Sequence, residues 1–200
     1  LTKRGYFVIR MGSIQSEALS TSNSMIIDYA SSPFRSEFGD IFLSEGCSAY
    51  IGSDSGIWTL PFIFRKPIAF VNFSFGVLDF MRRQSNYKFP VLPKQLYHIK
   101  KQRFLKLSEI IEIDGVFTGI GHELEASGVK TVSNTPEEIS DHVIEVCDRL
   151  EGRWQPHSED AALQKRFWDI YNQRFPAKEM GNIAPPISSE FLMKHLYLLD

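Results

Sequence analysis

The sequence predicts an α/β fold in which one parallel β-sheet carries α-helices on both faces. Two short apolar runs, Ser48–Ile51 and Ile68–Val71, have the length and composition of strands that are buried on both sides. About fifteen residues with an amphipathic pattern separate them, roughly the length that a right-handed crossover between parallel neighbours needs. A turn rich in Ser, Asp and Gly directly follows the first run, as expected where a strand ends and a crossover begins.

Further strand signals complete the sheet. Apolar runs of strand length predict three more parallel strands, at Tyr6–Ile9, Met25–Ile27 and Val129–Val132. The segment Leu92–Ile99 contains Pro93, which cannot donate a hydrogen bond to a neighbouring strand. That segment is therefore predicted to be an edge strand at most.

Helix signals alternate with these strands. Ser32 as N-cap and Pro33 at the first helical position predict a helix that ends at Gly46, with one face formed by Phe34, Phe38, Ile41 and Phe42. The clearest signal is the capping box of Thr135 and Glu138, with Pro136 at the first helical position. It predicts a continuous helix over Glu137–Leu150 that packs on the sheet through Ile139, Val143, Val146, Cys147 and Leu150.

Two more helices are predicted near the C-terminus. Asp160–Arg174 is amphipathic, and Ser188 or Ser189 caps a final helix that carries Phe191 and Leu192. The predicted organisation is therefore a parallel-sheet domain over residues 1–155 and a helical extension over residues 156–200 that packs on it.

Composition limits the classes of function. A chain of 200 residues with a formal net charge of −2 is long enough for a buried core and lacks the basic surface typical of nucleic-acid binding.

Cys47 and Cys147 are predicted to be reduced core residues, since neither has a second Cys or a His at metal-ligand spacing. No apolar run is long enough to span a membrane and no signal-peptide pattern opens the chain, which predicts a cytoplasmic protein. Because Leu1 is not an initiator methionine and strand-like sequence follows at once, we expect the chain to be the carboxyl part of a longer protein.

The turn formed by Ser53, Asp54, Ser55 and Gly56 is the first candidate binding site. In open α/β sheets ligands bind beyond the carboxyl ends of the strands, and serine hydroxyls and backbone amides there can bind an anion. Gly56 allows a ligand to approach the backbone. Asp54 would repel a diphosphate, so we expect its side chain either to turn inward and cap the helix or to accept a hydrogen bond from a sugar hydroxyl. The alternative is structural: Ser53 or Asp54 caps the next helix and Gly56 only relieves the turn.

Polar residues after the first two predicted strands are the second candidate. Arg10, followed by Gly12 and Ser13, comes directly after the first strand, where its guanidinium would point into the same crevice. Asp28 follows the second strand and could accept a hydrogen bond from a ribose hydroxyl or a base. The alternatives are a surface ion pair for Arg10 and a turn cap for Asp28.

Arg35 is placed by the sequence in the first turn of its helix, where the helix dipole disfavours a cation. It is a further candidate donor ligand, and the alternative is a salt bridge to Glu37 or Asp40. Asp40 is predicted to be structural. His122 and His142 are predicted to be exposed and without a chemical role.

Six segments of the chain, GYFVIRMGS, IIDYASSPFRSEFGDIFL, IGSDSG, FRKPIAFVN, NTPEEI and ISSEFL, resemble a group of bacterial glycosyltransferase-like proteins from surface-carbohydrate gene clusters. The run from Ser32 to Asn72 also resembles the nucleotide-sugar-binding half of GT-B glycosyltransferases, an outline shared by heptosyltransferases and UDP-N-acetylglucosamine 2-epimerases. The resemblance covers most of the chain. It implies a Rossmann-like domain equivalent to the C-terminal GT-B half, with an acceptor-binding domain that precedes this chain.

The implied activity is transfer of a sugar from a nucleotide sugar to a surface polysaccharide, another glycan or a lipid-linked acceptor. Ile57–Pro61 lacks the glutamates that such epimerases carry after this turn, which disfavours epimerisation. No Asp-x-Asp pair is present, so we expect a metal-independent enzyme without cofactors, in the cytoplasm or at the inner face of the membrane. Arg10 is the expected catalytic residue, and a similar arginine after a strand binds diphosphate in O-fucosyltransferase-like enzymes. The alternative is a non-catalytic nucleotide-sugar-binding or scaffolding module of the same fold.

Overall fold

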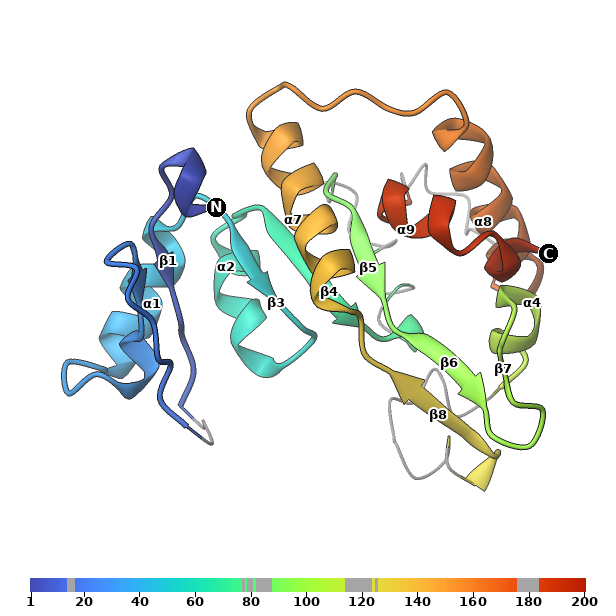
Figure 1. The fold of residues 1–200 in the computed structure, drawn as a ribbon, viewed down its shortest axis with the longest axis horizontal. Coiled ribbons are helices and arrows are strands. Elements are labelled where there is room, and N and C mark those ends of the chain that lie inside the picture. Colours follow the sequence, from blue (N-terminus) through green and yellow to red (C-terminus); the bar gives the residue numbers. More distant parts are fainter. Residues whose placement is uncertain are drawn as a thin grey trace. The chain divides into compact units, whose positions relative to one another are not determined.

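A computed structural model of the chain describes residues 1–13, 17–76, 78, 81, 88–113, 124, 126–175 and 184–200 (Figure 1). Helices and strands are mixed, and parallel strand pairs are present, which confirms the α/β class. Contacts divide the chain into two compact units. The first contains residues 1–50 and 56–67, and the second contains residues 51–55 and 68–200. Each unit is described by itself.

The first unit contains short strands and the helices α1 and α2. β1 (Val8–Ile9) and β2 (Ile26–Ile27) pair in parallel as a sheet of their own, with Val8 opposite Ile26. A 3-10 turn over Tyr29–Ser31 leads towards α1 (Glu37–Gly46), and α2 (Thr59–Ile63) belongs to the same unit.

The start of α1 differs from the prediction. The N-cap is Ser36, whose side chain accepts a hydrogen bond from the amide of Gly39 at 3.0 Å, whereas Ser32 accepts one from the amide of Phe34 in a local turn. The hydroxyl of Tyr29 accepts from the Ser36 amide and donates to the Ser36 carbonyl, at 2.9 and 3.1 Å. A Cβ on Gly39 would collide with this hydroxyl, so glycine is required in the first turn. The helix therefore begins where Tyr29 holds its N-cap.

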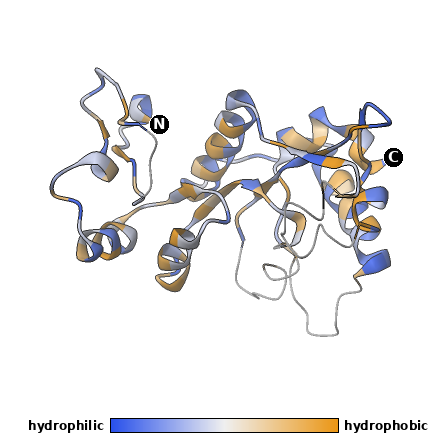
Figure 2. Ribbon diagram, turned by 90° about the horizontal axis from the view of Figure 1, so that it is seen from below, coloured by the Kyte–Doolittle hydropathy of each residue, from blue (hydrophilic) through white to orange (hydrophobic). Residues whose placement is uncertain are grey.

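Apolar residues of the first unit stay largely exposed. Phe34, Phe38 and Phe42 are 84%, 75% and 61% exposed, although the sequence places Phe38 and Phe42 on one helix face. Figure 2 shows apolar residues in orange along α1 and α2. The apolar side of α1 is therefore present but not buried.

The second unit contains a parallel sheet in the order β3–β4–β5. β3 (Tyr50–Gly52) contributes Ile51 and Gly52 to this unit, and β4 (Ile68–Phe73) lies between β3 and β5 (Val91–Pro93). β4 and β5 are parallel, with Phe70 opposite Val91. β4 is buried along most of its length, as its continuous apolar sequence predicts for a central strand. The predicted edge strand at Leu92–Ile99 divides at Lys94 into β5, the last strand of this sheet, and β6 (Gln95–His98).

A second, antiparallel sheet corrects one predicted strand. β6 lies between β7 (Arg103–Phe104) and β8 (Val129–Val132), and it is antiparallel to both. The prediction that Val129–Val132 joins a single five-stranded parallel sheet is therefore wrong. The exposed side chains of Lys130 and Thr131 give the physical reason, because a parallel strand of an α/β sheet is covered on both faces whereas an antiparallel one can face water.

α7 (Pro136–Leu150) packs on β4 and β5, as Figure 1 also shows. The predicted capping box is confirmed: the Thr135 hydroxyl accepts from the Glu138 amide at 3.2 Å, and Glu138 accepts from the Thr135 amide at 2.8 Å. Val143, Val146 and Cys147 are buried as predicted, while Ile139 and Leu150 are half-buried. Cys47 is only half-buried, and neither cysteine forms a disulfide.

His142 contradicts its prediction. It is fully buried on the face of α7 that was expected to be exposed, and neither ring nitrogen has a hydrogen-bond partner among the described residues. Burial, the largest cause, and the positive charge of Arg149 lower the pKa of His142 to about 3. The Phe70 backbone acts in the opposite direction and raises the pKa by a smaller amount. His122 lies outside the described residues.

The second unit also contains α4 (Leu107–Ile110), α8 (Asp160–Arg174) and α9 (Ser189–Lys194), followed by a 3-10 turn over Leu196–Leu199. α9 contacts both α7 and α8. Residues from the sheets and helices share one core, whose largest fully buried side chains include Ile68, Phe70, Phe73, Leu92, Leu107, Ile110, Phe167, Tyr171 and Leu192. The predicted C-terminal extension thus lies in the same unit as α7.

Candidate functional site

The Asp54 carboxylate connects the turn after β3 to the end of β4. Its Oδ2 atom accepts hydrogen bonds from the hydroxyl of Ser74 at 2.5 Å and from the Ser74 amide at 3.3 Å. Ser74 directly follows β4, so the contact joins the carboxyl ends of two neighbouring strands. Neither Ser53 nor Asp54 caps α2, whose N-cap position is Trp58. The side chain of Asp54 has thus turned inward, towards Ser74 rather than towards a helix.

Asn72 and Asn134 exchange hydrogen bonds at the carboxyl ends of β4 and β5. The Asn72 amide donates to the Asn134 side chain, and the Asn134 amide donates to the Asn72 side chain, both at 2.7 Å. Asn134 also donates to the carbonyl of Pro93 at 2.8 Å. Asn72 has a φ of 50°, in the left-handed region that Asn adopts more readily than most residues. These hydrogen bonds connect the ends of β4 and β5 to Asn134, the residue before the Thr135 cap of α7.

These contacts bring three of the segments quoted above to one edge of the sheet: IGSDSG with Asp54, FRKPIAFVN with Asn72, and NTPEEI with Asn134. The hydroxyls of Ser53 and Ser55 make no hydrogen bond within the part of the chain that the structure describes, and Ser55 and Gly56 are exposed. Polar groups at the carboxyl edge of parallel strands form the usual ligand site of an open α/β sheet. The edge therefore carries spare hydrogen-bond donors beside an Asp54 carboxylate that is already engaged.

Gly56 is not required by packing or by backbone conformation. A Cβ at this position would meet no atom within 4 Å, and its φ lies outside the left-handed region. Its carbonyl accepts a hydrogen bond from the Thr59 hydroxyl at 2.7 Å. The open space around Gly56 is what a ligand that approaches the backbone would need.

Arg10 and Asp28 meet in the first unit, at the ends of β1 and β2. Arg10 Nη1 lies 3.4 Å from Asp28 Oδ2 and donates to the carbonyl of Glu17 at 2.9 Å. Asp28 also accepts from the Leu19 amide at 2.7 Å, and this hydrogen bond is the main reason that the pKa of Asp28 is lowered, with Arg10 a smaller cause. The structure therefore contains the ion pair that was the alternative for Arg10. Since Arg10 belongs to the first unit and Ser53–Ser55 to the second, their convergence on one site stays a prediction.

The other predicted donor ligands lie in the first unit as well. Gly12 has a φ of 131°, a backbone conformation that favours glycine, and Ser13 is exposed. Arg35 precedes the N-cap of α1, so the prediction that it lies in the first turn of the helix, where the dipole disfavours a cation, is wrong. Its Nη2 atom lies 2.7 Å from Asp40 Oδ2, which is the structural salt bridge considered from the sequence.

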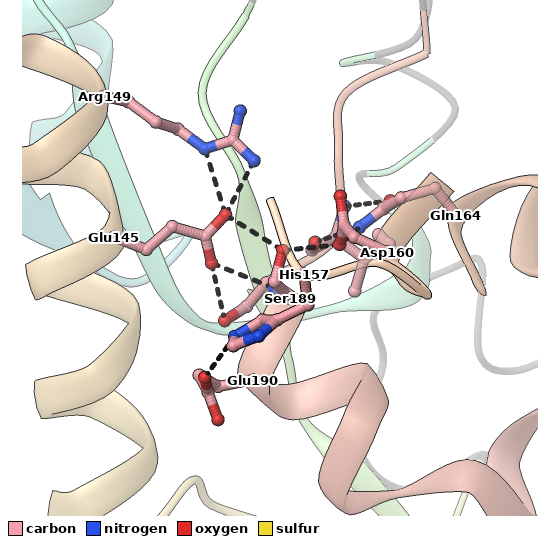
Figure 3. Close-up of polar contacts among 9 residues, drawn as sticks. Glu145, Arg149, His157, Asp160, Gln164, Ser189 and Glu190 are labelled. Carbon is pink, nitrogen blue, oxygen red and sulfur yellow. Dashed lines mark hydrogen bonds and ion pairs between the residues drawn. The ribbon is translucent and has the colours of Figure 1, made fainter. Parts of the chain in front are cut away.

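A buried carboxylate network was not predicted (Figure 3). Glu145 on α7 is 5% exposed, and Arg149 donates to its Oε1 atom from Nε and Nη2 at 3.0 and 2.8 Å. The amide of Ser189, the first residue of α9, donates to Glu145 Oε2 at 2.9 Å. The Ser189 hydroxyl donates to Asp160 Oδ1, at the start of α8, at 2.5 Å. One network thus joins α7, α8 and α9.

The same network forms one wall of a pocket of about 420 Å³, lined also by Trp154, His157 and Glu190 among others. Figure 3 shows His157 directed at Glu190, whose carboxylate is 2.8 Å from His157 Nε2. Burial raises the pKa of Glu145, although the Ser189 amide and Arg149 act in the opposite direction. Since both Glu145 oxygens accept from Arg149 or α9, we interpret the network as a brace between helices. The i, i+4 spacing of Glu145 and Arg149 was the available sequence signal, but α9 lies more than forty residues further along the chain.

None of the protein-family models, curated proteins or solved structures compared with the chain matches it. Within the described ranges, no helix has the length and apolar character needed to cross a membrane. Nor do three or more His, Cys, Asp or Glu side chains of the described residues gather closely enough to hold a metal ion.

Proposed function

We propose that this chain is the donor-binding half of a metal-independent glycosyltransferase that binds a nucleotide sugar at the carboxyl edge of β3 and β4. The observation that supports this most is the Asp54–Ser74 contact. It engages the one carboxylate of the turn and leaves the hydroxyls of Ser53 and Ser55 available to a ligand. The resemblance of the IGSDSG segment to GT-B donor sites supports the same assignment.

The proposed reaction transfers the sugar to a hydroxyl of a glycan or lipid-linked acceptor. The bond between the anomeric carbon and the diphosphate oxygen breaks, a bond to the acceptor oxygen forms, and the nucleoside diphosphate leaves with the bonding electrons. Hydrogen-bond donors placed where this charge develops lower the barrier. Ser53, Ser55 and the backbone near Gly56 supply such donors, and Arg10 is proposed as a cation for the diphosphate. The acceptor hydroxyl must lose its proton to a base, which we do not assign to a residue of this chain.

Thermal denaturation in the presence of UDP-glucose, GDP-mannose, dTDP-glucose and a CMP-sugar tests the proposal. A ligand at a hundred times its dissociation constant stabilises the native state by about 2.7 kcal/mol, which a melting experiment detects. We expect at least one diphosphate-linked sugar to bind. Stabilisation by none of these compounds would contradict the assignment, whereas binding without transfer to any glycan acceptor would favour the non-catalytic module.

Arg10→Ala should weaken binding of the active nucleotide sugar by about ten- to a hundredfold, because a charge-assisted contact is worth roughly 1.5–3 kcal/mol. Arg166→Ala is the matched control, since Arg166 is exposed on α8. Isothermal titration calorimetry measures both. Equal affinity of the Arg10 variant and the parent would remove Arg10 from the site without affecting the turn.

Two changes test the role of the Asp54–Ser74 contact. Ser74→Ala removes a donor and releases the carboxylate towards the diphosphate, which should weaken binding about two- to tenfold. Asp54→Asn removes the negative charge and keeps an acceptor for Ser74, so it should bind at least as well as the parent. Ser158→Ala, at an exposed serine, is the control. Weaker binding by Asp54→Asn would instead identify the carboxylate as a direct ligand of the sugar.

A further inference from the structure

Three aromatic side chains line a second pocket of about 350 Å³ in the second unit. Tyr97 from β6 and Phe104 from β7 pack edge to face with centroids 5.3 Å apart. Phe104 and Tyr197, from the C-terminal 3-10 turn, lie 5.9 Å apart with an angle of 32° between their planes. All three rings are half-buried, so part of each remains accessible. The volume lies at the lower end of the range of small-molecule sites.

Cationic side chains surround these rings. Arg103 and Lys106 line the pocket with Gln102, and Lys130 Nζ lies 5.2 Å from the centroid of the Tyr97 ring. Lys106 and Lys130 form no ion pair with any described residue, so their charges are available to a ligand. Lysines beside aromatic rings are a common arrangement for a ligand that is anionic at one end and flat at the other.

Arg103 is fixed in position by Glu109. Two hydrogen bonds of 2.6 and 2.5 Å join the guanidinium to the two carboxylate oxygens, and Lys101 lies 3.4 Å from the same group. These contacts, led by the hydrogen bonds from Arg103, lower the pKa of Glu109 to about 2. Glu109 neutralises Arg103, which leaves two positive charges without an ion pair among the described residues: Lys106 in the wall of the pocket and Lys130 beside the Tyr97 ring.

Tyr197 is also held in place. Its hydroxyl donates to Gln95 Oε1 at 2.7 Å, and Gln95 in turn donates to Glu138, the residue of the α7 capping box, at 3.3 Å. His195 Nε2 lies 2.5 Å from the same Glu138 carboxylate. The wall of the pocket is thus fixed before any ligand binds, which reduces the entropic cost of binding.

We propose that this pocket binds a nucleoside monophosphate, with the base against Tyr97, Phe104 and Tyr197 and the phosphate at Lys106 and Lys130. Aromatic rings stack on any base, and lysine ammonium groups bind phosphate as point charges. A single-stranded nucleic acid is less favoured because the chain as a whole carries a net charge of −2 and the rings line one small pocket. The inference does not rest on the proposed glycosyltransferase activity, since no residue of the 53–56 turn lines this pocket.

Calorimetric titration of the full chain with UMP and AMP tests the proposal, with uridine and ribose 5-phosphate as half-ligands. We expect both nucleotides to bind, and each half-ligand to bind at least tenfold more weakly. Phe104→Leu, which keeps an apolar side chain but removes the ring, should weaken UMP binding by about tenfold. Lys130→Gln and Lys106→Gln should each weaken it by about three- to tenfold, whereas Lys165→Gln, at an exposed lysine of α8, should not.

Several results would overturn the proposal that the pocket binds a nucleoside monophosphate. No saturable binding of either nucleotide, or unchanged UMP binding in Lys130→Gln, an exposed position that should not affect folding, would overturn the proposal. Ribose 5-phosphate that binds as tightly as UMP would reject the aromatic contact. Vesicles containing phosphatidic acid that bind while UMP does not would assign the cluster to a lipid headgroup instead, and binding of oligonucleotides alone would assign it to nucleic acid. Arg10→Ala and Ser74→Ala should leave UMP binding at this pocket unchanged, which separates its outcome from that of the proposed donor site.

Discussion

The two compact units combine the same kinds of element but differ in what is buried. Among the described residues of the first unit only Ala30, Ser44 and Pro61 are buried. In the second unit the sheets and helices enclose a continuous core that contains most of β4 and β5. Local hydrogen bonds, such as those of Tyr29 with Ser36, fix the turns of the first unit. The difference shows that a correct cap and a correct apolar pattern specify a helix, but a core forms only where two apolar faces meet.

The two units also differ in how deeply their polar side chains are buried. The second unit buries His142, Glu145 and Asp160 inside its packing, whereas the ion pairs of Arg10 and Arg35 in the first unit remain partly accessible to solvent. Buried polar groups cost more free energy when they are left unpaired or change charge than exposed groups do. Changes of pH and sequence should therefore affect the second unit more strongly.

The largest expected effect is the acid sensitivity that His142 gives the second unit. The unfolded chain binds a proton at this residue as the pH falls below about 6.5, but the folded protein does so only near its pKa of about 3. Because the unfolded state binds more protons in this interval, stability decreases as the pH falls, by about 5 kcal/mol down to pH 3, of which about 3 kcal/mol is lost between pH 7 and pH 4. Urea unfolding from pH 7 to pH 4 measures this dependence. His142→Leu should have a flatter profile, because it carries no group that the unfolded chain can protonate at this position. Parallel profiles for the parent and His142→Leu would contradict the assignment.

A matched pair of phenylalanines compares the two cores directly. Phe70→Ala removes a fully buried ring from β4 and should lower the free energy of unfolding by about 3–5 kcal/mol. Phe38→Ala removes a ring of α1 that is 75% exposed and should change it by less than about 0.5 kcal/mol. Urea unfolding followed by circular dichroism measures both. A similar loss for the two variants would show that the α1 face is buried in solution.

The two helix caps should give a smaller effect than the loss of a buried ring. Thr135→Ala and Ser36→Ala each remove a side chain that accepts a hydrogen bond from a backbone amide, and each should cost about 1 kcal/mol. Because α7 packs on the sheet, the stability lost in Thr135→Ala should appear as a lower midpoint of the main unfolding transition. Hydrogen exchange should place the loss from Ser36→Ala locally in α1. An unchanged melting temperature of Thr135→Ala would count against the α7 cap.

Elements with local signals could be predicted from the sequence. The Thr135 capping box and Pro136 place the start of α7 correctly, and the continuous apolar run at Ile68–Val71 identifies a buried strand, because such signals involve residues only a few positions apart. The prediction that Ser48–Ile51 is equally buried is wrong, since β3 lies at the end of its sheet and is only partly covered. The turn at Ser53–Gly56 also follows β3, as its local signal predicts, whereas the contact of Asp54 with Ser74, twenty positions away, could not be read from the sequence.

The pairing of strands and the meeting of distant polar groups could not be predicted, because both depend on tertiary packing. Val129–Val132 has strand composition, but its antiparallel direction depends on β6, some thirty residues earlier in the chain. The contacts of Asn72 with Asn134 and of Glu145 with Ser189 join residues 62 and 44 positions apart, and the burial of His142 depends on the sheet beneath α7. Residue type and spacing carry no information about such distances, because they are set by the packing of whole elements on one another.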